Sequence, residues 1–168
     1  RAPGSRQPAL AMPQRGPSGH TVLHRDSFAG SRQAALRRIS FQPSPEARDE
    51  AYPWLLTTGR SLYHFNAGTM TGRTDNMVLE DGDYLEICAD DARRMGFSNG
   101  ERIRVRSRHG EAFLPLRISG RMQSGQLFTT FHMQALKVNR VTSPWRDNVV
   151  QTPEYKVTAV AIERVSPA

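Results

Sequence analysis

An apolar strand that ends in a Gly- and Thr-rich loop is the feature that most constrains this chain. The run from Trp54 to Thr58 predicts a buried strand, and it breaks at Gly59 into a loop that reaches Thr71. Backbone N–H groups around glycines can form an anion-binding concavity, and Thr hydroxyls, an Arg fork and a His ring add hydrogen-bonding groups. The loop therefore suits a phosphate or pyrophosphate with an attached heterocycle, although a plain turn is the competing interpretation.

The same stretch carries a family resemblance. Residues 57–71 read T-T-G-R-S-L-Y-H-F-N-A-G-T-M-T, which resembles the motif opening the C-terminal cofactor domain of molybdopterin dinucleotide oxidoreductases, most closely the formate dehydrogenase α subunits. Phe131-His132, residues 138–142 and residues 152–157 resemble the motifs that close this domain. The resemblance runs from about Tyr52 to Val165, with both motif groups in the family's order and separation.

The resemblance implies a fold and a cofactor. The fold would be a double-psi β-barrel, and the cofactor a molybdopterin guanine dinucleotide that carries Mo or W in the complete enzyme. Carried over position by position, the residues that would surround this cofactor are Thr58, Gly59, Arg60, His64, Gly68, Thr69, Met70, Thr71, Asn139, Tyr155 and Lys156.

The chemistry of these side chains is compatible with that assignment. Thr hydroxyls and backbone N–H groups can bind phosphate oxygens, Asn139 offers a paired donor and acceptor, and Lys156 supplies a point charge. Structural interpretations remain open for several of them: an ion pair for Arg60, a packed histidine for His64, a core residue for Met70, a helix-end cap for Asn139 and a surface lysine for Lys156.

Short segments separated by turns predict a mainly β fold, a small barrel with one or two short helices. Residues 89–96 have acids at the start, two Arg near the end and a terminal Gly, which predicts a short helix. The predicted strands after the loop are residues 84–87, 102–108, 111–118, 126–131 and 157–162, and one helical turn is predicted within 132–139.

The pair of strands around residue 110 allows finer predictions. Arg at every second position from Arg102 to Arg108 places four guanidinium groups on one strand face, with Ile and Val on the other. His109-Gly110 fits a two-residue hairpin turn, with Glu111 near enough to pair with an Arg. Pro115 predicts that the returning strand is bulged or lies at an edge.

The N-terminal third differs in composition from the rest. Residues 1–18 are rich in Pro, Arg and Gly and predict a flexible segment; residues 19–51 predict an extended arm and connector; residues 52–165 form the predicted barrel domain. The net charge is +7, of which residues 1–50 hold +4. The resemblance implies that the arm packs on protein beyond this chain.

Several function classes are disfavoured. The chain has no apolar run long enough for a transmembrane helix and no secretory h-region, so a cytoplasmic location is expected. Cys88 is the single cysteine, which excludes an intrachain disulfide and a Cys-based cluster. The chain therefore lacks the metal and iron–sulfur ligands that the resembled enzymes carry in other domains.

The sequence predicts a cofactor-binding domain that is not catalytic alone and whose partners are the remaining catalytic domains or subunits. One alternative is a barrel that recruits a protein through an apolar patch near Trp145 or Phe131. The other is a nucleic-acid binder that uses the Arg102–Arg108 face and the arm. The absence of aromatic residues interleaved with those arginines disfavours nucleic acid.

Overall fold

The computed structural model describes residue 28 and residues 33–165. Contacts divide the chain into two units, residues 1–42 and residues 43–168. In the first unit, residues 33–42 form an irregular arm without helix or strand. The predicted flexible segment, residues 1–18, lies outside the described residues, and the boundaries proposed at 18 and 51 stay predictions.

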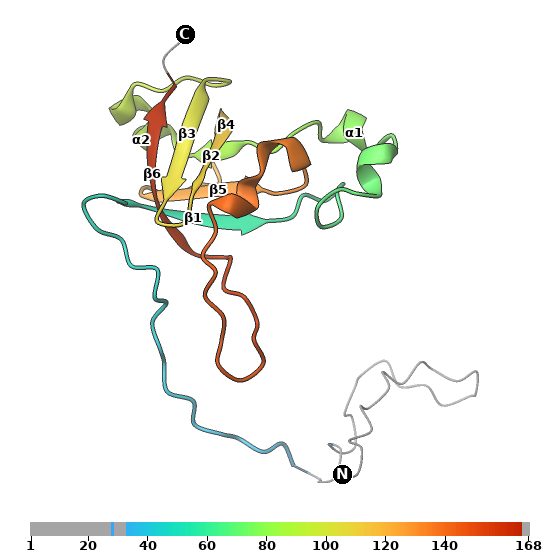
Figure 1. Cartoon of the computed structure of the whole chain (residues 1–168), viewed down its shortest axis with the longest axis vertical. Coiled ribbons are helices and arrows are strands. Elements are labelled where there is room, and N and C mark those ends of the chain that lie inside the picture. Colours follow the sequence, from blue (N-terminus) through green and yellow to red (C-terminus); the bar gives the residue numbers. More distant parts are fainter. Residues whose placement is uncertain (1–27, 29–32, 166–168) are drawn as a thin grey trace. The chain divides into compact units, whose positions relative to one another are not determined.

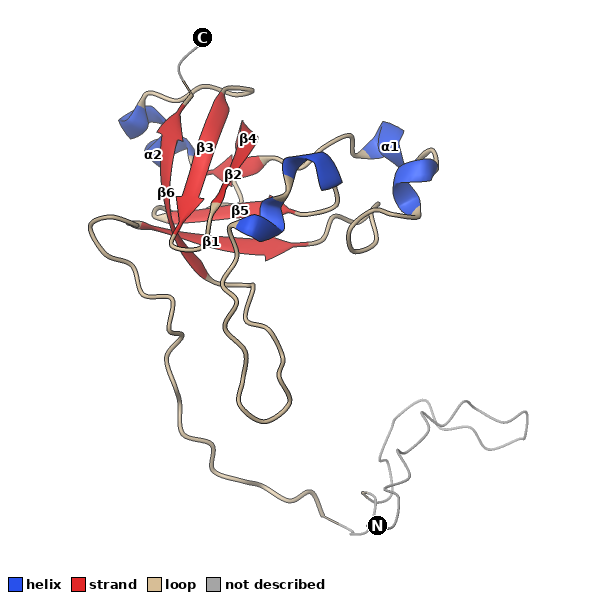
Figure 2. Ribbon diagram, in the orientation of Figure 1, coloured by secondary structure: helices blue, strands red, loops and turns tan. Residues whose placement is uncertain are grey.

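Six strands of the second unit close into a barrel (Figure 1, Figure 2), which confirms the mainly β fold. The order around the barrel is β1-β5-β2-β4-β3-β6. Two pairs, β1 with β5 and β2 with β4, are parallel, and the other four are antiparallel. The double-psi topology stays a prediction. The strands are β1 (Trp54–Gly59), β2 (Leu85–Ile87), β3 (Arg102–Ser107), β4 (Glu111–Ile118), β5 (Gln126–Thr130) and β6 (Thr158–Arg164).

Helices are short and lie between the strands. α2 (Ala89–Met95) is the helix predicted from its charges, and it ends at Gly96 in the left-handed conformation. α1 (Asn76–Leu79) and the 3-10 turn η1 (Thr71–Arg73) fall in the loop after β1, where no helix was predicted. Two further 3-10 turns, η2 (Gln134–Leu136) and η3 (Val138–Arg140), occupy the predicted helical turn after β5.

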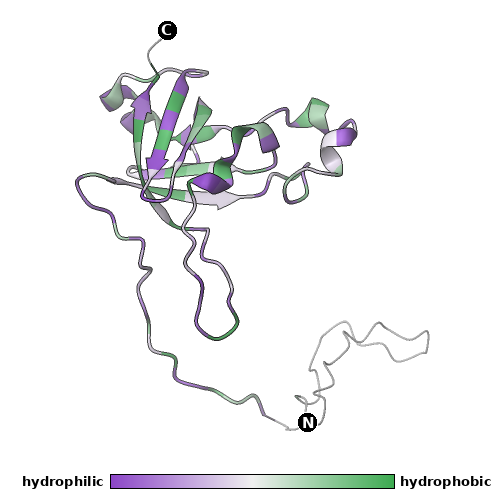
Figure 3. Cartoon of the chain, in the orientation of Figure 1, coloured by the Kyte–Doolittle hydropathy of each residue, from purple (hydrophilic) through white to green (hydrophobic). Residues whose placement is uncertain are grey.

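Alternating side chains build the barrel core. On β3, Ile103 and Val105 are fully buried, whereas the arginines between them face outward, and the alternation is visible as stripes in Figure 3. Burying each such aliphatic side chain stabilises the fold by about 1.5–3 kcal/mol. The other strands supply the remaining large, fully buried side chains, among them Leu56, Leu85, Ile87, Leu114, Leu116, Leu127 and Val160.

The β3–β4 hairpin differs from its prediction by one position. The Ser107 N–H donates to the Gly110 carbonyl over 2.8 Å, so the turn residues are Arg108 and His109 rather than His109 and Gly110. The Ser107 hydroxyl accepts hydrogen bonds from the N–H groups of His109 and Gly110, which stabilises this placement. Glu111 pairs with an Arg, as predicted: its Oε2 lies 2.5 Å from Nη2 of Arg104.

The prediction that Pro115 marks an edge or a bulge was wrong. β4 lies between β2 and β3 in the closed barrel, and Pro115 keeps regular register opposite Arg102. The next residue, Leu116, donates its N–H to β3's neighbour Glu101, so the nitrogen of Pro115 faces the β2 side. Pairing with β2 begins only at Leu116, and the missing N–H therefore leaves no ladder bond unmade.

A buried carboxylate joins α2 to the turn before β5. Asp91 is fully buried and accepts hydrogen bonds from the Ser124 hydroxyl at 2.8 Å and the Gly125 N–H at 2.7 Å. Burial alone would raise the pKa of Asp91, but these hydrogen bonds outweigh it and hold the pKa below its usual value of 3.8. The ionised form of Asp91 is therefore part of the folded structure.

Replacing Asp91 with Ala should lower the free energy of unfolding by about 2–4 kcal/mol, because it leaves buried donors without their acceptor. Asp90→Ala is the control: this carboxylate lies next to Asp91 but pairs with Arg93 on the exposed face, so its loss should matter much less. Denaturant unfolding at pH 7 measures both.

The contribution of Asp91 to the free energy of unfolding should also depend on pH. Because its folded-state pKa is lowered, this contribution is present above pH 3.8 and disappears as the pH falls through the folded-state pKa. A difference between wild type and D91A that persists in strong acid would contradict this account.

Candidate functional site

The end of β1 is where the two distant motif groups meet. Thr58 is buried, and its hydroxyl donates to the carbonyl of Tyr155 over 2.7 Å. In return, the Lys156 ammonium donates to the carbonyl of Thr58 over 3.0 Å. The structure thus brings together three of the predicted site residues, although Lys156 and Thr58 lie 98 positions apart in the sequence.

The loop after β1 folds over a pair of stacked histidines. His64 is buried, and its ring lies parallel to that of His132, with 4.1 Å between centroids and 7° between planes. Its Nδ1 is 3.0 Å from the Thr71 hydroxyl and its Nε2 is 2.7 Å from the Glu80 carbonyl oxygen. His64 therefore links the start of the loop to its end, and we call these two rings the histidine stack.

Asp83 holds the other ring of the histidine stack in place. Its fully buried carboxylate accepts the Thr130 hydroxyl at 2.5 Å and the N–H groups of His132 and Met133 at 3.1 and 2.8 Å. Nδ1 of His132 also lies 2.7 Å from this carboxylate, without the alignment of a ring hydrogen bond. Burial lowers the pKa of His132 below 6.5, with Asp83 opposing the shift and His64 adding to it.

Gly68 is required by the close approach of the loop to His132. Its φ is +67°, and a Cβ at this position would lie 2.7 Å from the backbone oxygen of His132. A contact this short with backbone cannot be relieved by a side-chain rotation. Gly59 has a related role, because a Cβ there would meet the Phe128 ring at 2.6 Å.

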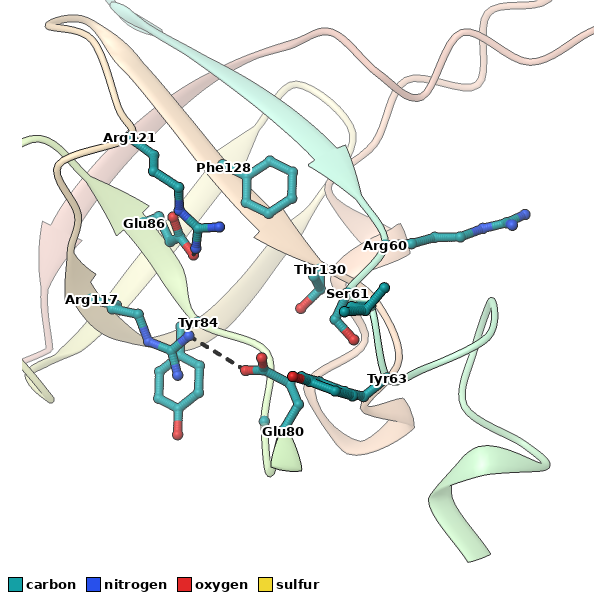
Figure 4. A pocket seen from close by; sticks show the side chains of 12 residues that line it. Arg60, Ser61, Tyr63, Glu80, Tyr84, Glu86, Arg117, Arg121, Phe128 and Thr130 are labelled. Carbon is teal, nitrogen blue, oxygen red and sulfur yellow. Dashed lines mark hydrogen bonds and ion pairs between the residues drawn. The ribbon is translucent and has the colours of Figure 1, made fainter. Parts of the chain in front are cut away.

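A polar cavity of about 240 Å³ opens beside the end of β1 (Figure 4). Side chains from four strands and their loops converge on it, and we call it the arginine pocket. It is lined by Arg60, Ser61, Leu62, Tyr63, Glu80, Gly82, Tyr84, Glu86, Arg117, Arg121, Phe128 and Thr130.

Two of its arginines are fixed by carboxylates. Arg117 lies over the Tyr84 ring at 3.6 Å and reaches Glu80 at 3.4 Å, as the dashed line in Figure 4 marks. Arg121 pairs with the buried Glu86 at 3.2 Å. The guanidinium of Arg60 extends away from these groups in Figure 4 and lies 5.0 Å from the Phe65 ring. The pocket thus combines cationic forks, aromatic faces and carboxylate acceptors.

The predicted site residues fall into separate places in the structure. Arg60 is the one that lines the arginine pocket, and Thr58 and Lys156 lie at the end of β1. Asn139 and Tyr155 line a second cavity of about 230 Å³, bounded also by Phe131, Ser143 and Pro153. The residues that gather at the histidine stack are His64, Gly68 and Thr71, whereas Thr69 and Met70 are exposed.

Sequence reasoning missed the polar residues that other strands contribute. Asp83 was not singled out, and His132 was named only as part of a motif, although Asp83 holds the His132 ring of the histidine stack. Arg117, Arg121 and Glu86 were not singled out. In the sequence, these three residues are marked only by a charge that lies within or just after an otherwise apolar strand.

The arginine face of residues 102–108, the alternative site for nucleic acid, is largely neutralised. Arg104 bonds to Glu111 at 2.8 Å and to Glu163 at 2.8 Å, and Arg108 pairs with Asp49 at 2.5 Å. Arg106 lies over the ring of Tyr52 at 5.2 Å. Carboxylates and an aromatic ring thus occupy positions where a nucleic-acid backbone would have to bind.

The fold and the site together define a small β-barrel domain with a polar pocket lined by arginine and glutamate side chains. The family model described as "Molydopterin dinucleotide binding domain" matches residues 54–159. The chain therefore belongs to the molybdopterin dinucleotide-binding domain family, which confirms the resemblance seen in its motifs.

Two kinds of oxidoreductase are among the proteins that this chain is similar to. The chain is 36% identical over 150 residues to the F420-dependent formate dehydrogenase subunit alpha of Methanocaldococcus jannaschii, covering 88% of this chain and 22% of that protein. It is 36% identical over 124 residues to a nitrate reductase of Symbiobacterium thermophilum, covering 71% and 16%. The chain thus spans about a fifth of the length of these relatives.

The fold also matches a solved structure. Acetylene hydratase from Pelobacter acetylenicus superposes with a TM-score of 0.57 at 18% identity, covering 68% of this chain and 18% of that one. This likeness concerns the fold alone. Within the described residues, the helices are too short and too polar to cross a membrane.

Gly68→Ala should lower the free energy of unfolding by about 2–3 kcal/mol, because it combines a left-handed backbone with a clash against the His132 carbonyl. Gly100→Ala is the matched control, since its φ is +78° with no atom within 4 Å of the added Cβ. Strain alone should cost the control about 1 kcal/mol. Thermal unfolding compares the two, and equal losses would contradict the close approach at Gly68.

Proposed function

We propose that this chain is the part of a formate dehydrogenase-like oxidoreductase that holds a molybdopterin guanine dinucleotide, and that it is not catalytic by itself. When bound, the cofactor and its metal, Mo or W, supply the redox chemistry. The residues of this chain bind and orient the cofactor. The observation that carries the proposal is the meeting of both family motifs at the end of β1, beside the arginine pocket.

The side chains in the arginine pocket fit the chemistry of such a cofactor. Its pyrophosphate needs cationic forks and hydroxyl donors, which Arg117, Arg121 and Ser61 offer. A guanine or pterin ring presents N–H donors along one edge, and Glu80 or Glu86 can accept them. The rings of Tyr84 and Phe128 offer planar faces against which a heterocycle can stack.

The size of the arginine pocket supports the need for further domains. Its volume of about 240 Å³ is below the roughly 300–1,000 Å³ of sites that enclose one drug-sized molecule. A dinucleotide is larger still, so this pocket can hold only part of it. The rest of the binding surface would come from other domains of the enzyme.

Exposed apolar side chains near the pocket point to the same partners. Between positions 62 and 79 the loop after β1 exposes more large apolar side chains than a free surface usually gathers in so short a stretch. We infer that the remaining catalytic domains or subunits cover them. They are Leu62, Phe65, Met70, Val78 and Leu79, each more than 60% exposed.

Formate is the substrate that we propose for the complete enzyme. The relatives covering most of this chain carry the name formate dehydrogenase, in Methanocaldococcus jannaschii and in Methanococcus maripaludis. The nitrate reductase covers a smaller share of the chain. On this proposal, the domain holds the cofactor in the formate dehydrogenases and in the nitrate reductase alike, and other domains select the substrate.

GDP should bind to the chain and shift the backbone amide resonances of the arginine pocket, since it carries the guanosine and pyrophosphate part of the cofactor. Arg60→Gln should weaken this binding by about tenfold, because Arg60 lines the pocket and its guanidinium, which points away from the other pocket groups in the structure, would turn toward the phosphate and donate one charge-assisted hydrogen bond. NMR titration near physiological ionic strength measures both. Arg60 has no ion pair with a described carboxylate, so this change leaves no described acid unpaired.

Arg104→Gln is the control for that titration. It removes the same charge from the outer face of β3, where Arg104 pairs with Glu111 and Glu163, and it should leave GDP binding unchanged. Shifts confined to Arg102–Arg108 that fade with added salt would contradict the pocket assignment and favour a nonspecific polyanion face. An absence of saturable shifts at millimolar GDP would contradict it as well.

A further inference from the structure

The hydrogen bonds of His64 show which ring nitrogen donates to the backbone. The Glu80 carbonyl oxygen can only accept, so Nε2 of His64 carries a proton. The Thr71 hydroxyl already accepts the Phe65 N–H at 3.2 Å and can donate its own hydrogen to Nδ1. A neutral ring with the proton on Nε2 therefore satisfies every group at this site.

His132 is also suited to the neutral form. Its ring is buried against the face of His64, and both of its nitrogens lack an aligned hydrogen-bond partner among the described residues. A charge there would be desolvated and would sit 4.1 Å from the neighbouring ring. Burial lowers the pKa of His132, in agreement with this geometry.

The charged groups around the histidine stack do not reverse this preference. Asp83, just before β2, favours a proton on His132, and Glu80, at the end of α1, adds a weaker attraction. The carboxylate of Asp83 is, however, already bonded to the Thr130 hydroxyl and two backbone N–H groups. The pKa of His132 stays below 6.5 in their presence. No group of three or more His, Cys, Asp or Glu side chains in the described part of the chain could hold a metal there.

Neighbours of His64, but neither ring of the stack, line the arginine pocket. Arg60, Ser61, Leu62 and Tyr63 precede His64 directly, and Glu80, whose carbonyl His64 binds, lines the same pocket. The His64 N–H also donates to the Ser61 hydroxyl at 3.1 Å. A displacement of the His64 ring would therefore move the pocket wall both at residues 60–63 and at Glu80.

We propose that His64 and His132 are positioning residues for this wall, and that the loop from Ser61 to Glu80 keeps its closed arrangement only while the His132 ring is neutral. In the open loop this ring is solvated and takes up a proton near the usual pKa of 6.5. Protons therefore bind more readily to the open form, and acid favours opening. The ratio of open to closed loop rises by at most about tenfold for each pH unit below 6.5 per proton taken up.

NMR of the chain without ligand tests the proposal. The ring ¹⁵N shifts of His132 should remain those of a neutral imidazole below pH 6.5, and the amide resonances of residues 61–80 should change as the ring finally charges. In His132→Phe, which keeps a stacked ring but cannot titrate, the pH response of the loop should vanish. The double variant His132→Phe, His64→Gln should behave in the same way, since the Gln amide can still donate to Glu80 and accept from Thr71.

His109→Gln is the matched control. His109 bonds to Glu46 at 2.7 Å, outside the loop, so the response of residues 61–80 should stay that of the wild type. A His132 ring that titrates at or above pH 6.5 would overturn the proposal, and this measurement needs no variant. A double variant whose loop follows the wild-type pH profile would overturn it too.

The consequence for ligand binding rests on the proposed function. If the pocket binds GDP, lowering the pH from 7.5 to 5.5 should weaken binding more in the wild type than in the double variant. Comparing the two proteins at each pH cancels the protonation of the nucleotide itself. Because the loop resonances are followed without ligand, failure of GDP binding would contradict the proposed function and leave the loop result standing.

Discussion

The carboxylate of Asp83 is the constraint on which the site depends. It lies fully buried before β2 and binds the segment that leaves β5, through the Thr130 hydroxyl and the N–H groups of His132 and Met133. This fixes His132, whose carbonyl excludes any Cβ at Gly68 and whose ring stacks on His64. One buried acid thereby determines how the loop after β1 returns to the barrel. A buried carboxylate with this many donors specifies one arrangement of its neighbours.

Much of the fold could be predicted because its signals are local. Alternation along Arg102–Ser107 and the charges and terminal glycine of α2 each act within a few residues. The position of Pro115 was misjudged because a sequence shows that an N–H is missing but not which neighbour would have received it. The hairpin turn was displaced by one residue because the Ser107 hydroxyl, rather than the glycine, organises it. Such errors concern pairing between elements, which local patterns do not contain.

The site was less predictable for the same reason. The family motifs located the loop and the segment around Tyr155, which the barrel brings together at Thr58. The arginine pocket, however, takes Glu86 from β2, Arg117 from β4 and Phe128 from β5. These strands are neighbours only because β5 and β4 each pair with β2, the first antiparallel and the second parallel. A parallel neighbour cannot follow directly in the sequence, so residues that share this pocket are separated along the chain.

The arginine pocket and the histidine stack differ in the charge of the side chains that form them. In the arginine pocket the paired arginines, Arg117 and Arg121, have side chains 38% and 80% exposed, so solvent reduces the electrostatic energy of each pair and a phosphate can compete for the guanidinium. Under the loop the histidines are buried, and a neutral ring avoids the desolvation that a charged ring would suffer. The first cluster can therefore exchange partners without unfolding. On our proposal, the second can charge His132 only by opening, which couples the protonation of this ring to the position of the pocket wall.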